Sequence, residues 1–188
     1  MKILAFAGAT RTESWNKKLI KIAAAGAKAA GAEVTLIDLR DYPLPLYDGD
    51  LEEKDGIPEN GMKLKALFLE HRGLLISSPE YNSSVTGVLK NTIDWVSRTA
   101  PGEKPLAAYA NKVAGLVSAS PGALGGLRGL VHLRSILGNI KCLVIPEQAS
   151  VSKAAEAFNP DGTLKDEKQR ASVEGVGKAL ATLLAKLG

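Results

Sequence analysis

The chain has few of the residue types and sequence features that several classes of protein require. Its 188 residues include a single cysteine, so no disulfide can form within it, which fits a reducing cytoplasm. Only 5% of the residues are aromatic, and the net charge of +4 comes from scattered lysines rather than a basic block. No apolar run approaches the roughly 18 residues that a membrane span needs. These shortages argue against a disulfide scaffold, a nucleic-acid partner and membrane insertion.

Residues that ligate metals or attack substrates are also scarce. His71, His132 and Cys142 do not have the spacing of a metal-ligand cluster. The sequence contains no GxxxxGK[ST], GxGxxG or GxSxG motif, which argues against a P-loop nucleotide hydrolase, a dinucleotide-binding Rossmann domain and a serine hydrolase. We therefore expect no catalytic metal and no side chain that itself reacts.

Strand-like apolar runs alternate with helical patterns along the whole chain. The runs that predict strands are Lys2–Ala7, Glu33–Asp38, Gly73–Ser77, Lys112–Ser118 and Lys141–Ile145. Helices are expected at about Ser14–Ala30, Glu59–Glu70, Val85–Arg98, Leu124–Leu137 and Asp166–Leu187. Residues 42–61 and 149–164 are predicted to be mostly irregular, because they are interrupted by turn-forming residues.

This alternation predicts one α/β domain that spans residues 1–188. The length and the apolar strands favour a flavodoxin-like three-layer sandwich, with a five-stranded parallel sheet in the order 2-1-3-4-5. Ligands of such sheets bind beyond the carboxyl ends of the strands, where the strand order reverses. The loops after strands one, three and four therefore form the predicted binding site.

The loop after the first strand, Gly8–Asn16, is predicted to bind a phosphate. Thr10 and Ser14 supply hydroxyls, Arg11 a guanidinium and Asn16 an amide. These groups precede a helix, whose N-terminal N–H groups and partial positive charge favour an anion. The alternative is a simple helix cap at Ser14 with a solvated loop, but a cap does not require the other polar groups.

The other two loops offer what a planar ring system needs. After strand three, Pro79 restrains the backbone, Tyr81 has a flat apolar face, and Asn82 can donate and accept hydrogen bonds. After strand four, residues 118–128 contain repeated glycines that let a backbone approach a ligand closely. Each loop alone also fits an ordinary connection, but the three together favour a phosphorylated flavin.

These segments resemble the NADPH-dependent FMN reductases, a family that includes quinone, azo-dye and chromate reductases. The resemblance is carried by GATRTESWN at residues 8–16, PLPLYD at 43–48, SPEYNSSVTGVLKNTIDW at 78–95 and the segment 118–134. It implies that FMN is the cofactor and that NADPH or NADH is the co-substrate. Hydride would then pass by way of FMN to a quinone or a similar acceptor, such as an azo dye or chromate, in a ping-pong scheme.

The resemblance also implies site residues and partners. The phosphate would be held by Thr10, Arg11, Ser14 and Asn16, and the ring would be lined by Pro79, Glu80, Tyr81 and Asn82. The pocket would be completed by Ser118, Ser120 and Gly122. A homodimer or homotetramer is implied as well, with Arg128 and Glu147 as candidate interface residues.

Three other functions stay open on sequence alone. The chain can be an FMN reductase that releases reduced flavin to another enzyme, which the sequence does not distinguish from tight FMN binding. It can be a flavodoxin-type electron carrier, although such carriers are typically acidic and this chain carries a net charge of +4. It can also be a flavin-free regulatory or scaffold protein, because fold does not fix function.

Overall fold

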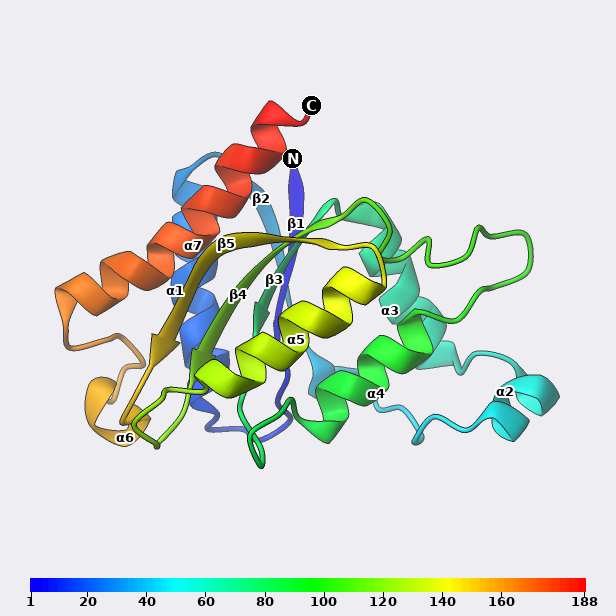
Figure 1. The fold of residues 1–188 in the computed structure, drawn as a ribbon, viewed down its shortest axis with the longest axis horizontal. Coiled ribbons are helices and arrows are strands. Elements are labelled where there is room, and N and C mark those ends of the chain that lie inside the picture. The colour runs from blue at the N-terminus through cyan, green and yellow to red at the C-terminus, as the bar shows by residue number, and fades with distance from the viewer.

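A central parallel sheet lies between two layers of helices in the computed structural model, which describes all 188 residues (Figure 1). The strand order is β2-β1-β3-β4-β5, which confirms the predicted flavodoxin-like arrangement. The strands are β1 (Lys2–Ala7), β2 (Glu33–Asp38), β3 (Gly73–Ser77), β4 (Val113–Ala119) and β5 (Leu143–Val151).

The helices divide between the two faces of the sheet. One face is covered by α1 (Trp15–Ala29) and α7 (Glu167–Lys186), and the other by α3 (Glu59–Glu70), α4 (Gly87–Val96) and α5 (Leu127–Asn139). The connections hold α2 (Gly49–Asp55), α6 (Ala154–Ala157) and a short 3-10 turn at Leu39–Asp41. No helix combines the length and apolarity that crossing a bilayer requires.

The burial of the strands follows their place in the sheet. The inner strands β1, β3 and β4 are buried almost throughout, whereas the edge strands β2 and β5 are partly exposed. Two apolar cores result, one between the sheet and α1 with α7, and one between the sheet and the other three long helices. Because both faces are packed, the carboxyl ends of the inner strands are held in one fixed row.

Strand β5 is longer than the sequence predicts. The apolar pattern places its end at Ile145, but the strand continues to Val151. Pro146 cannot donate a ladder hydrogen bond, so in the sequence it marks the end of a strand. In the structure it lies in an irregular stretch: Val144 pairs with Ala114 and Gln148 pairs with Leu116, so β5 advances four residues while β4 advances two. An edge strand tolerates such a bulge, so the proline interrupts β5 without ending it.

Two short helices also fall in stretches predicted to be mostly irregular. Helix α2 buries none of its residues, so it has no apolar periodicity that could have revealed it. It begins where the side chain of Asp48 accepts a hydrogen bond from the backbone N–H of Asp50. Helix α6 has only four residues, which is about one turn.

Helices α1 and α7 touch through their backbones. A Cβ atom on Gly177 would lie 1.9 Å from the backbone oxygen of Ala23, and one on Gly26 would lie 2.0 Å from the backbone oxygen of Glu174. No real Cβ atom makes contacts this short, so any larger residue must push the two helices apart.

We predict that Gly177→Ala lowers the free energy of unfolding by about 1–3 kcal/mol or more, because overpacking forces the backbone to move. Gly175→Ala is the matched control on the same helix, since a Cβ atom added there would have no neighbour within 4 Å. Alanine favours a helix by up to about 1 kcal/mol over glycine, so this control should gain stability. Urea unfolding measures both, and equal stabilities would contradict the close helix crossing.

Candidate functional site

The loops after β1, β3 and β4 surround one hollow of about 270 Å³. It brings together seven of the predicted site residues, namely Arg11, Ser14, Asn16, Pro79, Glu80, Tyr81 and Ser120. Larger hollows of about 490 and 420 Å³ lie between β5 and α7 and beside α1 and β2. The smaller hollow is the candidate site because it alone lies among all three loops at the point where the strand order reverses.

The loop after β1 has hydrogen-bond donors that the protein itself does not use. The backbone N–H groups of Arg11, Thr12 and Glu13 make no hydrogen bond within the chain. Ser14 is the residue before α1, but its hydroxyl makes no capping hydrogen bond and so is also free. Unpaired N–H groups in a loop that leads into a helix N-terminus are a common phosphate site. The loop therefore fits a phosphate group.

Arg11 adds a positive charge to the same wall of the hollow. Its guanidinium carbon lies 5.1 Å from the centroid of the Trp15 ring, and its Nη2 donates to the backbone oxygen of Glu13 at 2.9 Å. These contacts orient the guanidinium and leave most of its donors free. The Glu13 carboxylate does not oppose it, because that side chain is 77% exposed and pairs with Lys18 at 3.3 Å.

Two of the residues predicted to contact the phosphate, Thr10 and Asn16, do not offer free donors to the hollow. Thr10 is exposed and lines a separate hollow of about 310 Å³, together with Arg40 and Tyr42. Asn16 lines the candidate site but is only 3% exposed, and its side chain is bonded to the protein. The free donors of this loop that line the candidate site are therefore those of Arg11 and Ser14, whereas Thr12 and Glu13 line the hollow beside α1 and β2.

The loop after β3 forms a tight hairpin turn that presents Tyr81. Tyr81 and Ser84 exchange two backbone hydrogen bonds of 3.0 Å, and the residues between them, Asn82 and Ser83, have φ values of 49° and 66°. Two successive positive φ values are characteristic of a type I′ turn. The Tyr81 side chain is 60% exposed, so its ring forms a flat apolar ledge at the rim of the hollow.

Glu80 ties this turn to the start of α5. Its carboxylate accepts hydrogen bonds from Nε and Nη2 of Arg128, at 2.9 and 2.6 Å, and from the backbone N–H of Gly129 at 3.1 Å. Burial acts to raise the pKa of Glu80, but the Gly129 N–H and the Arg128 guanidinium outweigh it and hold the pKa below its ordinary value. The carboxylate is therefore ionised and occupied by the protein.

Buried polar side chains join the loops to one another. Asn16 Nδ2 donates to the backbone oxygen of Ala119 at 2.7 Å, and Asn16 Oδ1 accepts from Ala119 N and from Ser77 Oγ at 3.0 and 2.8 Å. Ser118 Oγ donates to the backbone oxygen of Ser78 at 2.6 Å. These bonds connect the loops after β1, β3 and β4.

A further tie runs between α4 and the first loop. The hydroxyl of Thr86 donates to the backbone oxygen of Gly8 at 2.7 Å and caps α4 by accepting from Leu89 N at 3.2 Å. Sequence reasoning missed Thr86 and Ser77. Their only signals are their places, one just before a helix and one at the end of a strand, which many serines and threonines share.

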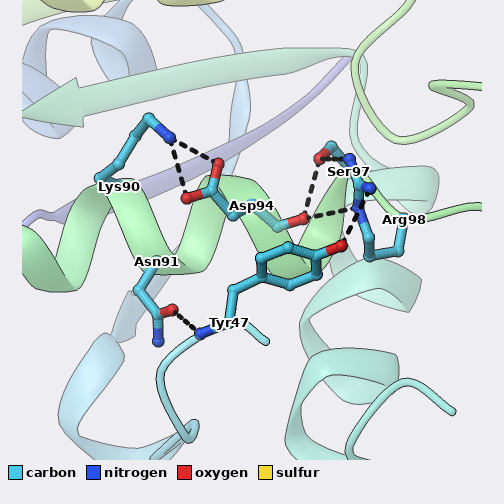
Figure 2. A network of polar contacts seen from close by, with 6 residues as sticks. All are labelled: Tyr47, Lys90, Asn91, Asp94, Ser97 and Arg98. Carbon is cyan, nitrogen blue, oxygen red and sulfur yellow. Dashed lines mark hydrogen bonds and ion pairs between the residues drawn. The ribbon is translucent and has the colours of Figure 1, made fainter. Parts of the chain in front are cut away.

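The second half of the SPEYNSSVTGVLKNTIDW segment lies away from the hollow. Asn91 on α4 accepts from the backbone N–H of Tyr47 and donates to the backbone oxygen of Pro45, both at 2.8 Å. The buried Trp95 also donates to Pro45 at 2.8 Å. Figure 2 shows the Tyr47 ring lying along α4 with its hydroxyl toward Arg98. These residues clamp the connection after β2 onto α4.

Comparison with known proteins identifies the family. A family model described as NADPH-dependent FMN reductase matches residues 1–156. The chain belongs to this family. This family member is 33% identical to an NAD(P)H-dependent FMN reductase of Pseudomonas aeruginosa, over the whole of this chain and 97% of the relative. It is 34% identical to an NAD(P)H:quinone oxidoreductase of Solanum tuberosum, again over the whole chain and 94% of the relative.

The fold of this FMN reductase family member agrees with a solved flavoenzyme. The NAD(P)H:(acceptor) oxidoreductase of Paracoccus denitrificans superposes with a TM-score of 0.81 at 27% identity, covering 98% of this chain and 97% of the other. The predictions of a flavodoxin-like enzyme, of FMN as cofactor and of a reduced nicotinamide as co-substrate are thereby confirmed. The free donors of the first loop fit the phosphate of that cofactor.

The ion pair of Glu80 predicts a stability contribution that depends on pH. The pKa of Glu80 is lowered from 4.5, so its contribution is complete above that value and is lost as the pH falls through the lower folded-state pKa. We expect Glu80→Gln to lower the free energy of unfolding by about 1–3 kcal/mol at pH 7. The difference from the unsubstituted chain should shrink in acid below pH 4.5.

Urea unfolding at neutral and acid pH measures this difference. The control is Glu59→Gln, because Glu59 is exposed and pairs only with Lys63 one helical turn away. Exposed pairs of this kind contribute little, so the control should remain close to the unsubstituted chain at every pH. A Glu80→Gln difference that does not change with pH would show that the ion pair does not stabilise the turn.

Proposed function

We propose that this chain transfers hydride from NADPH or NADH to quinones or similar acceptors, such as azo dyes and chromate, in a ping-pong reaction. The observation that supports this most is the combination, in one hollow, of unused donors for a phosphate and an exposed aromatic ledge. The whole of residues 1–188 would serve as one flavin-binding domain. The need for reduced nicotinamide favours a cytoplasmic location.

The residues of the hollow divide into three tasks. Arg11 and Ser14 would hold the FMN phosphate. Pro79 and Tyr81 would support the ring, beside the backbone of Ser120. FMN supplies the capacity to accept and release hydride when it is bound.

The remaining predicted residues would act from the edges of the hollow. Asn82 shapes the turn that carries Tyr81 through its positive φ, and Ser118 is fully buried beneath Ser78. The backbone N–H of Gly122 donates to Ser120 Oγ at 3.3 Å, which keeps the last loop narrow. Thr10 would support the first loop from its other side.

A ping-pong order follows if the bound ring leaves one face open, because the donor and the acceptor would then occupy that face in turn. The one carboxylate of the hollow, that of Glu80, is held in an ion pair with Arg128. The side chains would therefore position the donor and the acceptor and would not exchange protons with them.

Quinones are favoured as acceptors because the Solanum tuberosum relative, 34% identical to this chain, is described as an NAD(P)H:quinone oxidoreductase. Release of free reduced flavin and a role as an electron carrier are the competing functions.

Stopped-flow mixing with NADPH should bleach the visible band of bound flavin, and a quinone added afterwards should restore it. Steady NADPH oxidation with a quinone, in the absence of a second reductase, would separate an enzyme from an electron carrier. Yellow colour that survives gel filtration would separate tightly bound FMN from a flavin that is released. The proposal fails if NADPH leaves the flavin spectrum unchanged.

A homodimer or homotetramer is part of the same proposal. Several exposed apolar side chains lie in the turn after β3 and around the start of α5, namely Tyr81, Leu124, Leu127 and Val131. Exposed apolar clusters of this kind often mark interfaces. Arg128 lies on the same helix and Glu147 on the edge strand β5.

We expect light scattering to give the mass of a dimer or tetramer, and Val131→Glu to shift it to a monomer. Val131 is 59% exposed, so the substitution should not disturb the fold of one subunit. Lys178→Glu, which changes charge on the exposed side of α7, is the control and should keep the original mass. A monomeric mass for the unsubstituted chain at micromolar concentration would contradict the proposal.

A further inference from the structure

The backbone of Ala119 needs hydrogen-bond partners that β3 does not provide. Strand β3 pairs with β4 as far as Ser77 and Val117, and the ladder ends where Ser78 N donates to Val117 O at 2.9 Å. To continue, the ladder would need Ala119 N to donate to Ser78 O and Glu80 N to donate to Ala119 O, and neither bond is formed. Strand β4 nevertheless continues to Ala119. One peptide unit is therefore missing beside it.

The side chain of Asn16 occupies that place. Its Nδ2 donates to Ala119 O and its Oδ1 accepts from Ala119 N, at 2.7 and 3.0 Å, which is how a neighbouring strand would pair with this residue. The double contact also fixes which end of the amide is oxygen, since Ala119 N–H must meet an acceptor. Ser77 Oγ supplies a second donor to Oδ1 at 2.8 Å.

These contacts use most of what the amide can offer. Oδ1 accepts two hydrogen bonds, which fills both of its lone pairs, and Nδ2 has already given one of its two hydrogens to Ala119. The residue is 3% exposed. Ser14 lies two positions before Asn16 and Ser120 directly follows Ala119, and both line the hollow. A shift of this amide would move one wall of the hollow relative to the other.

We propose that Asn16 is a positioning residue, whose amide stands in for one peptide unit of β3 and sets the spacing of the three loops. This role differs from the phosphate contact that the sequence resemblance implies. The expected effect of this positioning role on flavin binding rests on the function proposed above. Burial makes the bonds strong determinants of geometry, because loss of the amide leaves Ala119 and Ser77 with unpaired polar groups.

Comparison of FMN with riboflavin separates the two roles, because riboflavin lacks the phosphate. Asn16→Ala should raise the Kd of both flavins by the same factor, about tenfold, as expected when buried polar groups lose their partners. Ser77→Ala, which cannot touch the ligand, should raise both by a smaller equal factor. Arg11→Ala is the control for a true phosphate contact and should weaken FMN only.

Quenching of flavin fluorescence measures all these constants. A loss confined to FMN in Asn16→Ala would overturn the positioning role and would make Asn16 a phosphate ligand. If Asn16→Ala does not fold, Ser77→Ala carries the comparison, and equal weakening of both flavins still supports the proposal. An unchanged Kd for both flavins in Ser77→Ala would then overturn it.

Amide hydrogen exchange without flavin gives an independent test. Asn16→Ala should speed exchange in residues 78–84 and 118–126 and leave the α7 segment 173–184 unchanged. Val176→Ala, a buried substitution on α7, is the control for general destabilisation and should act on α7 instead. Unchanged exchange in both loops of Asn16→Ala would overturn the proposal. A protein that binds neither flavin would refute the proposed function, and the exchange result would still decide the role of Asn16.

Discussion

The paired hydrogen bonds between the Asn16 amide and the backbone of Ala119 are the contact on which the candidate site depends. They join the first turn of α1 to the end of β4, and Ser77 extends the same contact to the end of β3. Because the bonds are buried, breaking them leaves polar groups without partners, which costs far more than the loss of an exposed bond. The three loops therefore behave as one frame.

Within this frame the polar residues have separate tasks. Asn16, Ser118, Thr86 and the Glu80 carboxylate bond to the protein and hold the loops together. The free N–H groups and hydroxyl of the first loop point to no partner in the chain and are left for an anion. A polar residue type in a binding loop thus does not by itself reveal a ligand contact, since the frame needs the same hydroxyls, amides and carboxylates.

The sequence predicted the strand order, the two helical layers and the three loops that meet at the hollow. These features follow from alternating apolar patterns and from the geometry of parallel sheets, which are local or general properties. The predicted end of β5 was wrong, because Pro146 is a valid stop signal in an isolated strand and only the bulged edge pairing accommodates it. Helix α2 escaped notice because it buries nothing.

The sequence by itself determined which chemical groups are available near the strand ends. It also showed a resemblance to one family in these loops. Tertiary structure decided which of these groups are free. Thr10 lines a second hollow, and the Glu80 carboxylate accepts hydrogen bonds from Arg128 and Gly129. The Asn16 amide pairs with the backbone of Ala119. The physical reason is that hydrogen-bond partners far apart in sequence compete for the same side chains, and only the packed fold sets the distances that decide the competition.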